Sequence, residues 1–203
     1  MTMRVKWIWM NGQMMTMKNE GLKINRGTGL QFPTISDIKN LLINEGDSGV
    51  KILFVCHGNI CRSAAAEMVM RHMIAQRGLE RKIVCESAAA TGEEIGNDVY
   101  PPMKRTLLAH GIPCPHHSAR MLTRRDGEKY DMVIGMDREN LSDMRRILGD
   151  RAMDRCSLLM DHAGFPGREV EDPWYTRDFE SAYRDVETGC RALLDELAGT
   201  GLT

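Results

Sequence analysis

The strongest constraint on the fold is an apolar run, residues 50–56 (VKILFVC), that ends at a short polar loop. A run of this length between polar residues is typical of a strand that is buried on both faces. After the loop, residues 63–77 place apolar side chains at helical spacing with charged residues between them, and Gly78 follows as a stop signal. A strand that leads through a tight loop into a helix predicts a parallel α/β arrangement.

The same alternation continues along the rest of the chain. Three further apolar segments have the length of strands: residues 82–86, 130–136 and 155–159. Helical patterns accompany them at residues 101–111, 138–148 and 179–197. The sequence therefore predicts an α/β fold with an open four-stranded parallel sheet and helices on both faces.

The first 49 residues differ in composition, because they hold six of the 16 methionines and two of the three tryptophans. Within them, a capping residue and an apolar stripe predict a short helix at 36–45, and turn-forming residues at 45–49 mark a boundary. We therefore expect an N-terminal extension at 1–49, partly disordered or with a short helix, a domain at 50–199 and a tail at 200–203. The extension could be a poorly ordered segment or a docking arm.

Composition narrows the classes of function. The 27 basic and 28 acidic residues nearly balance, whereas a dedicated nucleic-acid binder would carry a basic excess. No apolar run approaches the roughly 20 residues that span a bilayer. Six cysteines are too few for a disulfide scaffold, and no C-x2-C pair suggests a zinc site. We expect a cytoplasmic protein with no metal, no cofactor, no nucleic-acid partner and no membrane span.

The loop after the first strand carries the motif C-x5-R-S in Cys56 to Ser63 (CHGNICRS). Backbone N–H groups in such a loop can converge beside the positive end of the helix dipole and hold an oxyanion. Gly58 is expected to supply the backbone angles of a tight anion nest. Arg62 presents a planar fork that matches two phosphoryl oxygens. The same field favours the thiolate of Cys56, to which Ser63 can donate. We predict a phosphate-binding loop with Cys56 as nucleophile.

A nucleophile needs a general acid to expel a poor leaving group. The candidate is Asp172, in the segment EDPWY, where Pro173 favours an extended conformation of the preceding residue. Trp174 and Tyr175 could form the walls of a slot for a flat substrate ring. The alternative is an ordinary turn that opens the last helix. The remaining cysteines are expected to be small buried hydrophobes: Cys85, Cys114, Cys156 and Cys190.

The segment VCHGNICRS, with EDPWY about 115 residues later, resembles the low-molecular-weight protein tyrosine phosphatase family over residues 50–199. The resemblance implies that Cys56 attacks phosphotyrosine in a protein substrate and forms a phosphocysteine. Arg62 and the loop amides would hold the transferring oxygens. Asp172 would protonate the phenolate and then deprotonate the water that releases inorganic phosphate.

The resemblance also implies supporting roles. Asn59 and Ser87 would brace the loop by side-chain hydrogen bonds, and a histidine in an H-x-x-R context would join them. His117 has that spacing, although an alternative count favours His116. Cys61 would be the redox partner of Cys56 in a protective disulfide. The implied substrate-binding residues are His57, Gly58, Asn59, Ile60, Cys61, Ser63, Glu93, Trp174 and Tyr175.

The chain departs from the family pattern at a few positions. Ala64 stands where many members have proline after the loop serine, which affects the helix start but removes no catalytic group. Glu93 stands where many have an aromatic pocket wall, so acidic phosphopeptides should be disfavoured. Trp174 replaces the first tyrosine of the common Tyr-Tyr pair, which keeps the aromatic wall.

Three other functions remain as alternatives. Arsenate reductase on the same fold needs two further cysteines, usually after the third strand, and residues 130–148 contain none. Protein-arginine phosphatases tend to carry threonine where Ile60 stands. A non-catalytic phosphate-binding module would have no need to retain Cys56, Arg62 and Asp172 together.

Overall fold

The computed structural model describes residues 6–10, 13–17 and 49–199. The chain divides into two compact units, residues 1–32 and 33–203. In the first unit, strands β1 (Lys6–Met10) and β2 (Gln13–Met17) pair in antiparallel fashion, an arrangement that the sequence analysis did not predict. The helix predicted at 36–45 and the turn at 45–48 lie outside the described residues.

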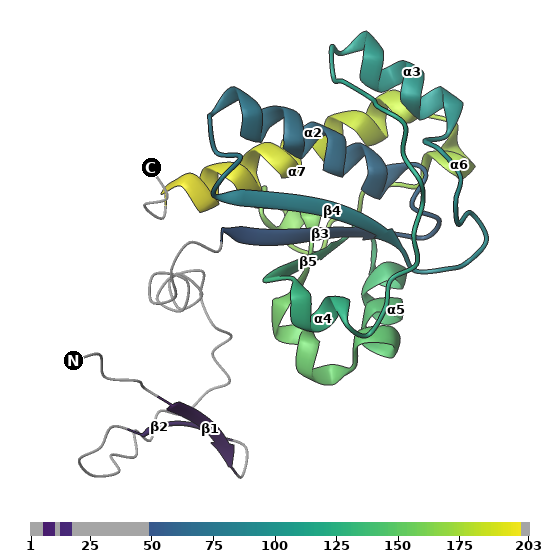
Figure 1. The fold of residues 1–203 in the computed structure, drawn as a ribbon. Helices are drawn as coiled ribbons and strands as arrows, with labels where there is room; N and C mark the ends of the chain where they lie inside the picture. Colours follow the sequence, from purple (N-terminus) through teal and green to yellow (C-terminus); the bar gives the residue numbers. More distant parts are fainter. Residues whose placement is uncertain (1–5, 11–12, 18–48, 200–203) are drawn as a thin grey trace. The chain divides into compact units, whose positions relative to one another are not determined.

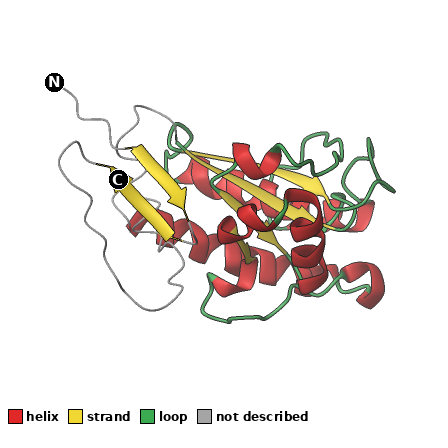
Figure 2. Cartoon of the chain, turned by 90° about the horizontal axis from the view of Figure 1, so that it is seen from below, coloured by secondary structure: helices red, strands yellow, loops and turns green. Residues whose placement is uncertain are grey.

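The second unit contains the predicted four-stranded parallel sheet, in the order β4-β3-β5-β6 (Figures 1 and 2). Its strands are β3 (Val50–Cys56), β4 (Ile83–Ala89), β5 (Met132–Gly135) and β6 (Cys156–Leu158). The carboxyl ends of all four strands therefore meet at one edge of the sheet, where ligands bind in open parallel sheets.

Helices cover both faces of this sheet, as predicted (Figure 1). One face carries α2 (Arg62–Gln76) and α7 (Phe179–Gly199), with α3 (Pro101–Ala109) packed against α7. The opposite face carries α4 (Asp126–Lys129) and α5 (Arg138–Leu148). Short helical turns complete the connections: η1 (Asp150–Arg155), η2 (Leu159–Asp161) and α6 (Pro173–Thr176).

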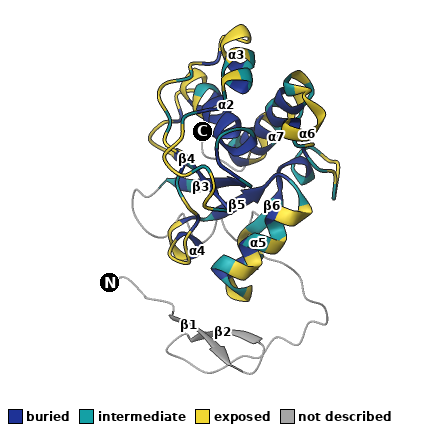
Figure 3. Ribbon diagram, turned by 90° about the vertical axis from the view of Figure 1, so that its right-hand side faces the viewer, coloured by how far each residue is buried: buried dark blue, intermediate teal, exposed yellow. Residues whose placement is uncertain are grey.

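Strand β3 is buried because β4 and β5 lie on either side of it and a layer of helices covers each face of the sheet (Figure 3). Ile52 and Phe54 join the core on the side of α2 and α7, whereas Leu53 and Val55 join the core on the side of α5. Successive side chains of a strand point to opposite faces, so a continuous apolar run is needed to fill both cores.

Helix α2 is buried along most of its first ten residues, because α7 covers the side that faces away from the sheet. Ala64, Ala65 and Ala66 are fully buried and allow close packing there. Helix α7 is amphipathic, and its apolar stripe includes Leu193, Leu194 and Leu197, in agreement with the predicted closing helix.

Strand β4 extends beyond the predicted end at residue 86. Its last residues, Ser87 to Ala89, continue the parallel ladder with β3, in which Ser87 pairs with Phe54 and Ala89 with Cys56. A serine and alanines carry little strand propensity, so the local sequence did not indicate this extension. The extension places Ser87 beside the loop that follows β3.

The packing of α7 on η2 can be tested at Gly189. A Cβ atom there would lie 2.5 Å from Cγ and 3.1 Å from the carbonyl oxygen of Leu159. We expect Gly189→Ala to destabilise the domain by about 1–3 kcal/mol through overpacking, although alanine favours helix. Urea denaturation would measure the loss. Gly199→Ala is the matched control, because the same helix leaves open space there; equal stability changes in both variants would contradict this packing.

Candidate active site

The loop between β3 and α2 takes its sharp bend at Asn59, which has a φ of 57°. The prediction that Gly58 supplies the backbone angles of the anion nest is wrong, because Gly58 does not have a positive φ. Asparagine tolerates the left-handed region better than most residues. Gly58 is instead a site of close approach, where an added Cβ would lie 3.0 Å from Cγ of Glu94.

Cys56 is the last residue of β3, and its Sγ lies 3.0 Å from Oγ of Ser63 in the first turn of α2. Both residues are buried. The side-chain amide of Asn59 donates to Oγ of Ser63 at 3.0 Å and to Oγ of Ser87 at 2.8 Å. The Asn59 side chain therefore connects Ser63, which contacts the Cys56 thiol, with Ser87 on strand β4.

Two residues beyond the loop also form hydrogen bonds with Asn59, one with its main chain and one with its side chain. Nε2 of His117 donates to the carbonyl oxygen of Asn59 at 2.8 Å, and the Arg120 N–H donates to Asn59 Oδ1 at 3.1 Å. Of the two candidate histidines, His117 contacts the loop. His116 has an 80% exposed side chain and faces Asp98 at 3.6 Å.

Asp98 is a supporting residue that the sequence analysis missed. Its Oδ1 accepts the backbone N–H groups of Val99 and His117, at 2.7 Å and 2.9 Å, and its Oδ2 accepts from Lys104. The hydrogen bond from Lys104, followed by those from His117 and Val99, holds the pKa of Asp98 well below its usual range. The Asp98 carboxylate thus holds the backbone that carries His117 through a hydrogen bond.

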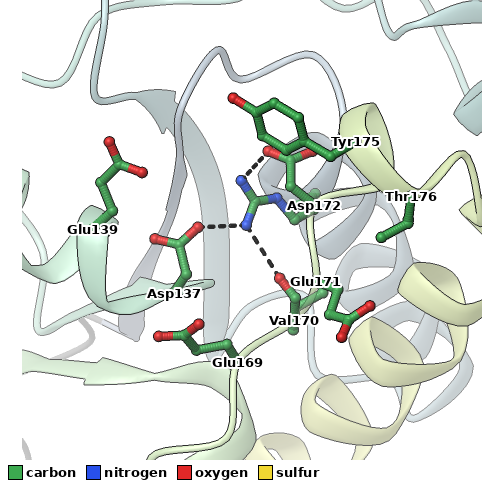
Figure 4. A pocket seen from close by; sticks show the side chains of 9 residues that line it. Asp137, Glu139, Glu169, Val170, Glu171, Asp172, Tyr175 and Thr176 are labelled. Carbon is green, nitrogen blue, oxygen red and sulfur yellow. Dashed lines mark hydrogen bonds and ion pairs between the residues drawn. The ribbon is translucent and has the colours of Figure 1, made fainter.

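Arg62 begins α2, and its side chain is only 3% exposed. Its Nη1 donates to Asp137 Oδ2 at 2.6 Å and to the carbonyl oxygen of Val170 at 3.1 Å, and its Nη2 donates to Asp172 Oδ2 (Figure 4). Burial disfavours the charged guanidinium, but the negative charges of Cys56, Asp172 and Asp137 outweigh burial and raise the pKa of Arg62. The arginine therefore remains a cation in a largely buried position.

Asp172 has the extended conformation expected before a proline, with φ −78° and ψ 111°. It caps the short helix α6, because its Oδ1 accepts the Trp174 N–H at 2.9 Å. Helix α6 ends at Thr176, and Arg177 follows with a φ of 61°, so Pro173 opens this separate turn rather than the closing helix. The cap leaves the second oxygen of Asp172 on Arg62, 110 residues away in the chain.

Two aromatic residues, Trp174 and Tyr175, follow Asp172 in the chain. The ring of Trp174 packs at 5.3 Å from that of Tyr100, whose N–H donates to the carbonyl oxygen of Ile60 in the loop. Tyr175 is 83% exposed. Tyr100 was missed by the sequence analysis, since a tyrosine before Pro-Pro carries no signal of its later contact with Trp174.

An open cavity of ≈ 430 Å³ lies between Arg62, Asp137, Asp172 and Tyr175 (Figure 4). Its remaining lining residues are Glu139, Glu169, Val170, Glu171 and Thr176. The cavity is bordered mainly by carboxylates around one guanidinium. It adjoins the loop through Arg62.

On the other side of the loop, Glu93 has a side chain that is 72% exposed, and its Oε2 lies 3.2 Å from Nε2 of His57. The Thr91 N–H donates to the carbonyl oxygen of His57 at 3.0 Å. The segment that carries Glu93 is thereby fixed beside the loop, but Glu93 is not among the residues that line the cavity described above.

All six cysteines are free thiols. Cys61 is partly buried just before α2, where burial, followed by the negative charges of Cys56 and Asp172, raises the pKa of its thiol. Burial also raises the pKa of Cys85 to about 12 and that of Cys156 to about 11. Within residues 6–10, 13–17 and 49–199, no group of three or more histidine, cysteine or acidic side chains could hold a metal ion.

The arrangement joins a thiol, a hydroxyl, a buried guanidinium and a carboxyl group at the carboxyl edge of a parallel sheet. Such a set can hold an oxyanion, attack its central atom and exchange a proton with a leaving group. None of the helices in the described part of the chain is long and apolar enough to cross a membrane.

Comparisons with known proteins agree with this geometry. Residues 51–201 match the model of the low molecular weight phosphotyrosine protein phosphatase family. The low molecular weight protein-tyrosine-phosphatase YfkJ of Bacillus subtilis is 36% identical over 146 residues, which cover 71% of this chain and 94% of YfkJ. The human low molecular weight phosphotyrosine protein phosphatase is 36% identical over 151 residues, with the same two coverages.

Solved structures agree as well. The crystal structure of YfkJ has a TM-score of 0.73 and covers 77% of this chain and 99% of its own. The YwlE arginine phosphatase has a TM-score of 0.67 over 73% of this chain and 96% of its own, but at 22% identity it shows only a shared fold. By its matched length and its sequence identity to curated relatives, the chain belongs to the low molecular weight phosphotyrosine protein phosphatase family.

Proposed function

We propose that this protein hydrolyses phosphotyrosine monoesters in proteins through a phosphocysteine intermediate. The observation that carries the proposal is the convergence of Cys56, Ser63, Arg62 and Asp172. These groups come from the end of β3, the start of α2 and the segment before α6. Together they supply a nucleophile, a hydrogen bond for its anion, an oxyanion clamp and an acid.

In the first step, the Cys56 thiolate attacks phosphorus and the bond to the tyrosine oxygen breaks. Arg62 and the loop N–H groups hold the transferring oxygens. A bound phosphoryl group would compete with Asp172 for the guanidinium, and this frees the Asp172 carboxyl to carry a proton to the departing phenolate. Asp137 retains the other side of the guanidinium and keeps it in position.

In the second step, Asp172 takes a proton from water, and the resulting hydroxide attacks the phosphocysteine. The sulfur–phosphorus bond breaks, inorganic phosphate leaves and Cys56 returns as a thiolate. The Ser63 hydroxyl, 3.0 Å from Sγ, stabilises the departing sulfur anion.

The surroundings of the site favour a flat, aromatic leaving group. Tyr175 lines the cavity beside Asp172, and Trp174 is half exposed next to it, so we assign both as aromatic walls. His57, Ile60 and Cys61 of the loop would border the other side. Glu93 adds an exposed negative charge at the entrance, which disfavours acidic phosphopeptides. Ile60, where arginine phosphatases tend to carry threonine, favours phosphotyrosine over phosphoarginine.

Cys61 is the proposed redox partner of the nucleophile. Hydrogen peroxide would oxidise the Cys56 thiolate to a sulfenic acid. The Cys61 thiolate would then attack that sulfur and form a disulfide. The hydroxide that leaves would take up the proton released by the Cys61 thiol and become water. Burial and then the charge of Cys56 raise the pKa of Cys61 in the resting enzyme. Because a sulfenic acid is neutral, oxidation removes one of these causes and makes the resolving thiolate easier to form.

The nucleophile can be tested by Cys56→Ser. We expect hydrolysis of p-nitrophenyl phosphate to be abolished, because serine is not ionised at neutral pH, while calorimetry still detects binding of inorganic phosphate to the loop. The half-buried Cys114→Ser is the control and should retain full turnover. Substantial turnover in Cys56→Ser would show that the nucleophile is assigned wrongly.

The acid can be tested by Asp172→Ala. We expect kcat for phenyl phosphate to fall by about 10²–10⁴-fold, and less for p-nitrophenyl phosphate, whose leaving group needs little protonation. Asp178→Ala is a matched control, because Asp178 accepts the Ser181 N–H at the start of α7 without touching Arg62. Equal slowing for both substrates would reduce Asp172 to a structural role.

The redox role can be tested by Cys61→Ser. After brief treatment with hydrogen peroxide and then dithiothreitol, the native protein should regain most of its activity, because a disulfide is reducible. Cys61→Ser should regain much less, because its Cys56 proceeds to sulfinic acid. Mass spectrometry of the Cys56 peptide would measure both products. Equal recovery in the two proteins would exclude the disulfide.

A further inference from the structure

Glu67, on the buried side of α2, is connected to the site through hydrogen bonds that the proposed mechanism does not use. Its side chain is only 11% exposed. One carboxylate oxygen pairs with Nη2 of Arg71 at 2.7 Å, and the other accepts the hydroxyl of Ser87. A buried carboxylate needs such partners, but this one also imposes a direction on the hydroxyl that it binds.

The donor and acceptor roles in this hydrogen bond determine the roles in the next ones, as far as Cys56. Because the single proton of Ser87 goes to Glu67, Ser87 must accept from Asn59 Nδ2, 2.8 Å away. The amide of Asn59 cannot turn over, since its Oδ1 already accepts the Arg120 N–H. Its second N–H therefore donates to Ser63 Oγ.

Ser63 accepts from Asn59, which polarises its hydroxyl and makes it a stronger donor. Toward a thiolate at Sγ of Cys56, 3.0 Å away, only the proton of Ser63 can serve. A donor in that position stabilises the thiolate over the thiol. We propose that Glu67 is a positioning residue that, together with the Arg120 N–H on the other side of the Asn59 amide, sets the polarity of the hydrogen bonds Ser87–Asn59–Ser63, and that it thereby keeps Cys56 in its nucleophilic form.

This inference rests on the proposed function, in which Cys56 is the nucleophile, and it makes a distinctive prediction about sign. Acting through space alone, the negative charge of Glu67 would disfavour the Cys56 thiolate, so its removal would favour that anion. Acting through the hydrogen bonds, Glu67 favours the thiolate, so its removal would have the opposite effect. The two effects can therefore be told apart by the direction of one measured shift.

The other titratable side chains near the two ends of this series of hydrogen bonds, Glu67 and Cys56, are not mutated in the test. Around Cys56 they are Arg62, Asp172 and Cys61, and His117 contacts the main chain of Asn59. Around Glu67 they are Arg71 from the same helix and Cys85 from β4, whose thiol donates to the Glu67 carbonyl oxygen.

The experiment compares Glu67→Gln with the native protein. Glutamine keeps the volume, but Arg71 attracts its amide oxygen, so its NH₂ group faces Ser87 and reverses that hydrogen bond. We expect the pH midpoint for alkylation of Cys56 by iodoacetate, followed by peptide mass spectrometry, to rise by about one pH unit. The acidic limb of kcat/KM should move with it. A midpoint that falls or stays unchanged would overturn the proposal.

Two further variants define the route. Ser87→Ala breaks the same connection from its other end by removing one hydroxyl, with Glu67 left in place, and it should also raise the midpoint; no rise would refute the relay. In Glu67→Gln with Ser87→Ala, the midpoint should rise no further than in Ser87→Ala alone, whereas additive rises would contradict the relay.

The matched control is Glu187→Gln. Glu187 forms an i,i+4 pair with Arg191 on α7, as Glu67 does with Arg71 on α2, but none of its described contacts leads to the loop. In Glu187→Gln, the pH midpoint for alkylation of Cys56 should equal that of the native protein. A rise as large as in Glu67→Gln would attribute the effect to charge removal in general. Failure of the proposed function would be recognised separately, as turnover that survives Cys56→Ser.

Discussion

The burial of β3 between two neighbouring strands and two layers of helices is the constraint on which the site depends. A strand fixed in this way cannot shift its register without moving its apolar side chains to the wrong face. The ladder with β4 therefore places Ser87 opposite Phe54 and Ala89 opposite Cys56. Because the strands are parallel, Cys56 reaches the sheet edge just where the chain must turn and begin α2, so the same packing that stabilises the core delivers the thiol to the loop.

The loop is held rigid by polar groups that are buried and fully paired. Asn59 is completely buried, and hydrogen bonds from its side chain and main chain reach Ser63, Ser87, His117 and Arg120. Among the described residues, no buried side-chain nitrogen or oxygen atom lacks a partner. Since each unpaired buried group would cost about 1–3 kcal/mol, alternative loop conformations that break these bonds are disfavoured. The loop conformation that the proposed mechanism requires is therefore already present in the ligand-free protein.

Arg62 joins parts of the chain that are far apart in sequence. Asp137 follows β5, and both Val170 and Asp172 precede α6, yet all three accept hydrogen bonds from one guanidinium. In the ligand-free protein, the carboxylates neutralise a cation that would otherwise be buried without compensation. In the proposed mechanism, a phosphoryl group would bring its own negative charge and take the place of Asp172, which would link substrate binding to the release of the proposed acid.

The sequence by itself determined the features that depend on neighbours in the chain. A strand, loop and helix with the spacing C-x5-R-S, and an aspartate held extended by Pro173, follow from local backbone preferences and from the chemistry of cysteine and arginine. The tertiary structure decided what depends on long-range packing: the left-handed residue being Asn59 rather than Gly58, the length of β4, the contact of His117 rather than His116 with the loop, and the places of Tyr100, Asp98, Asp137 and Glu67. Their partners lie 19 to 75 residues away in the chain, and only the order and register of the strands determine which of them meet.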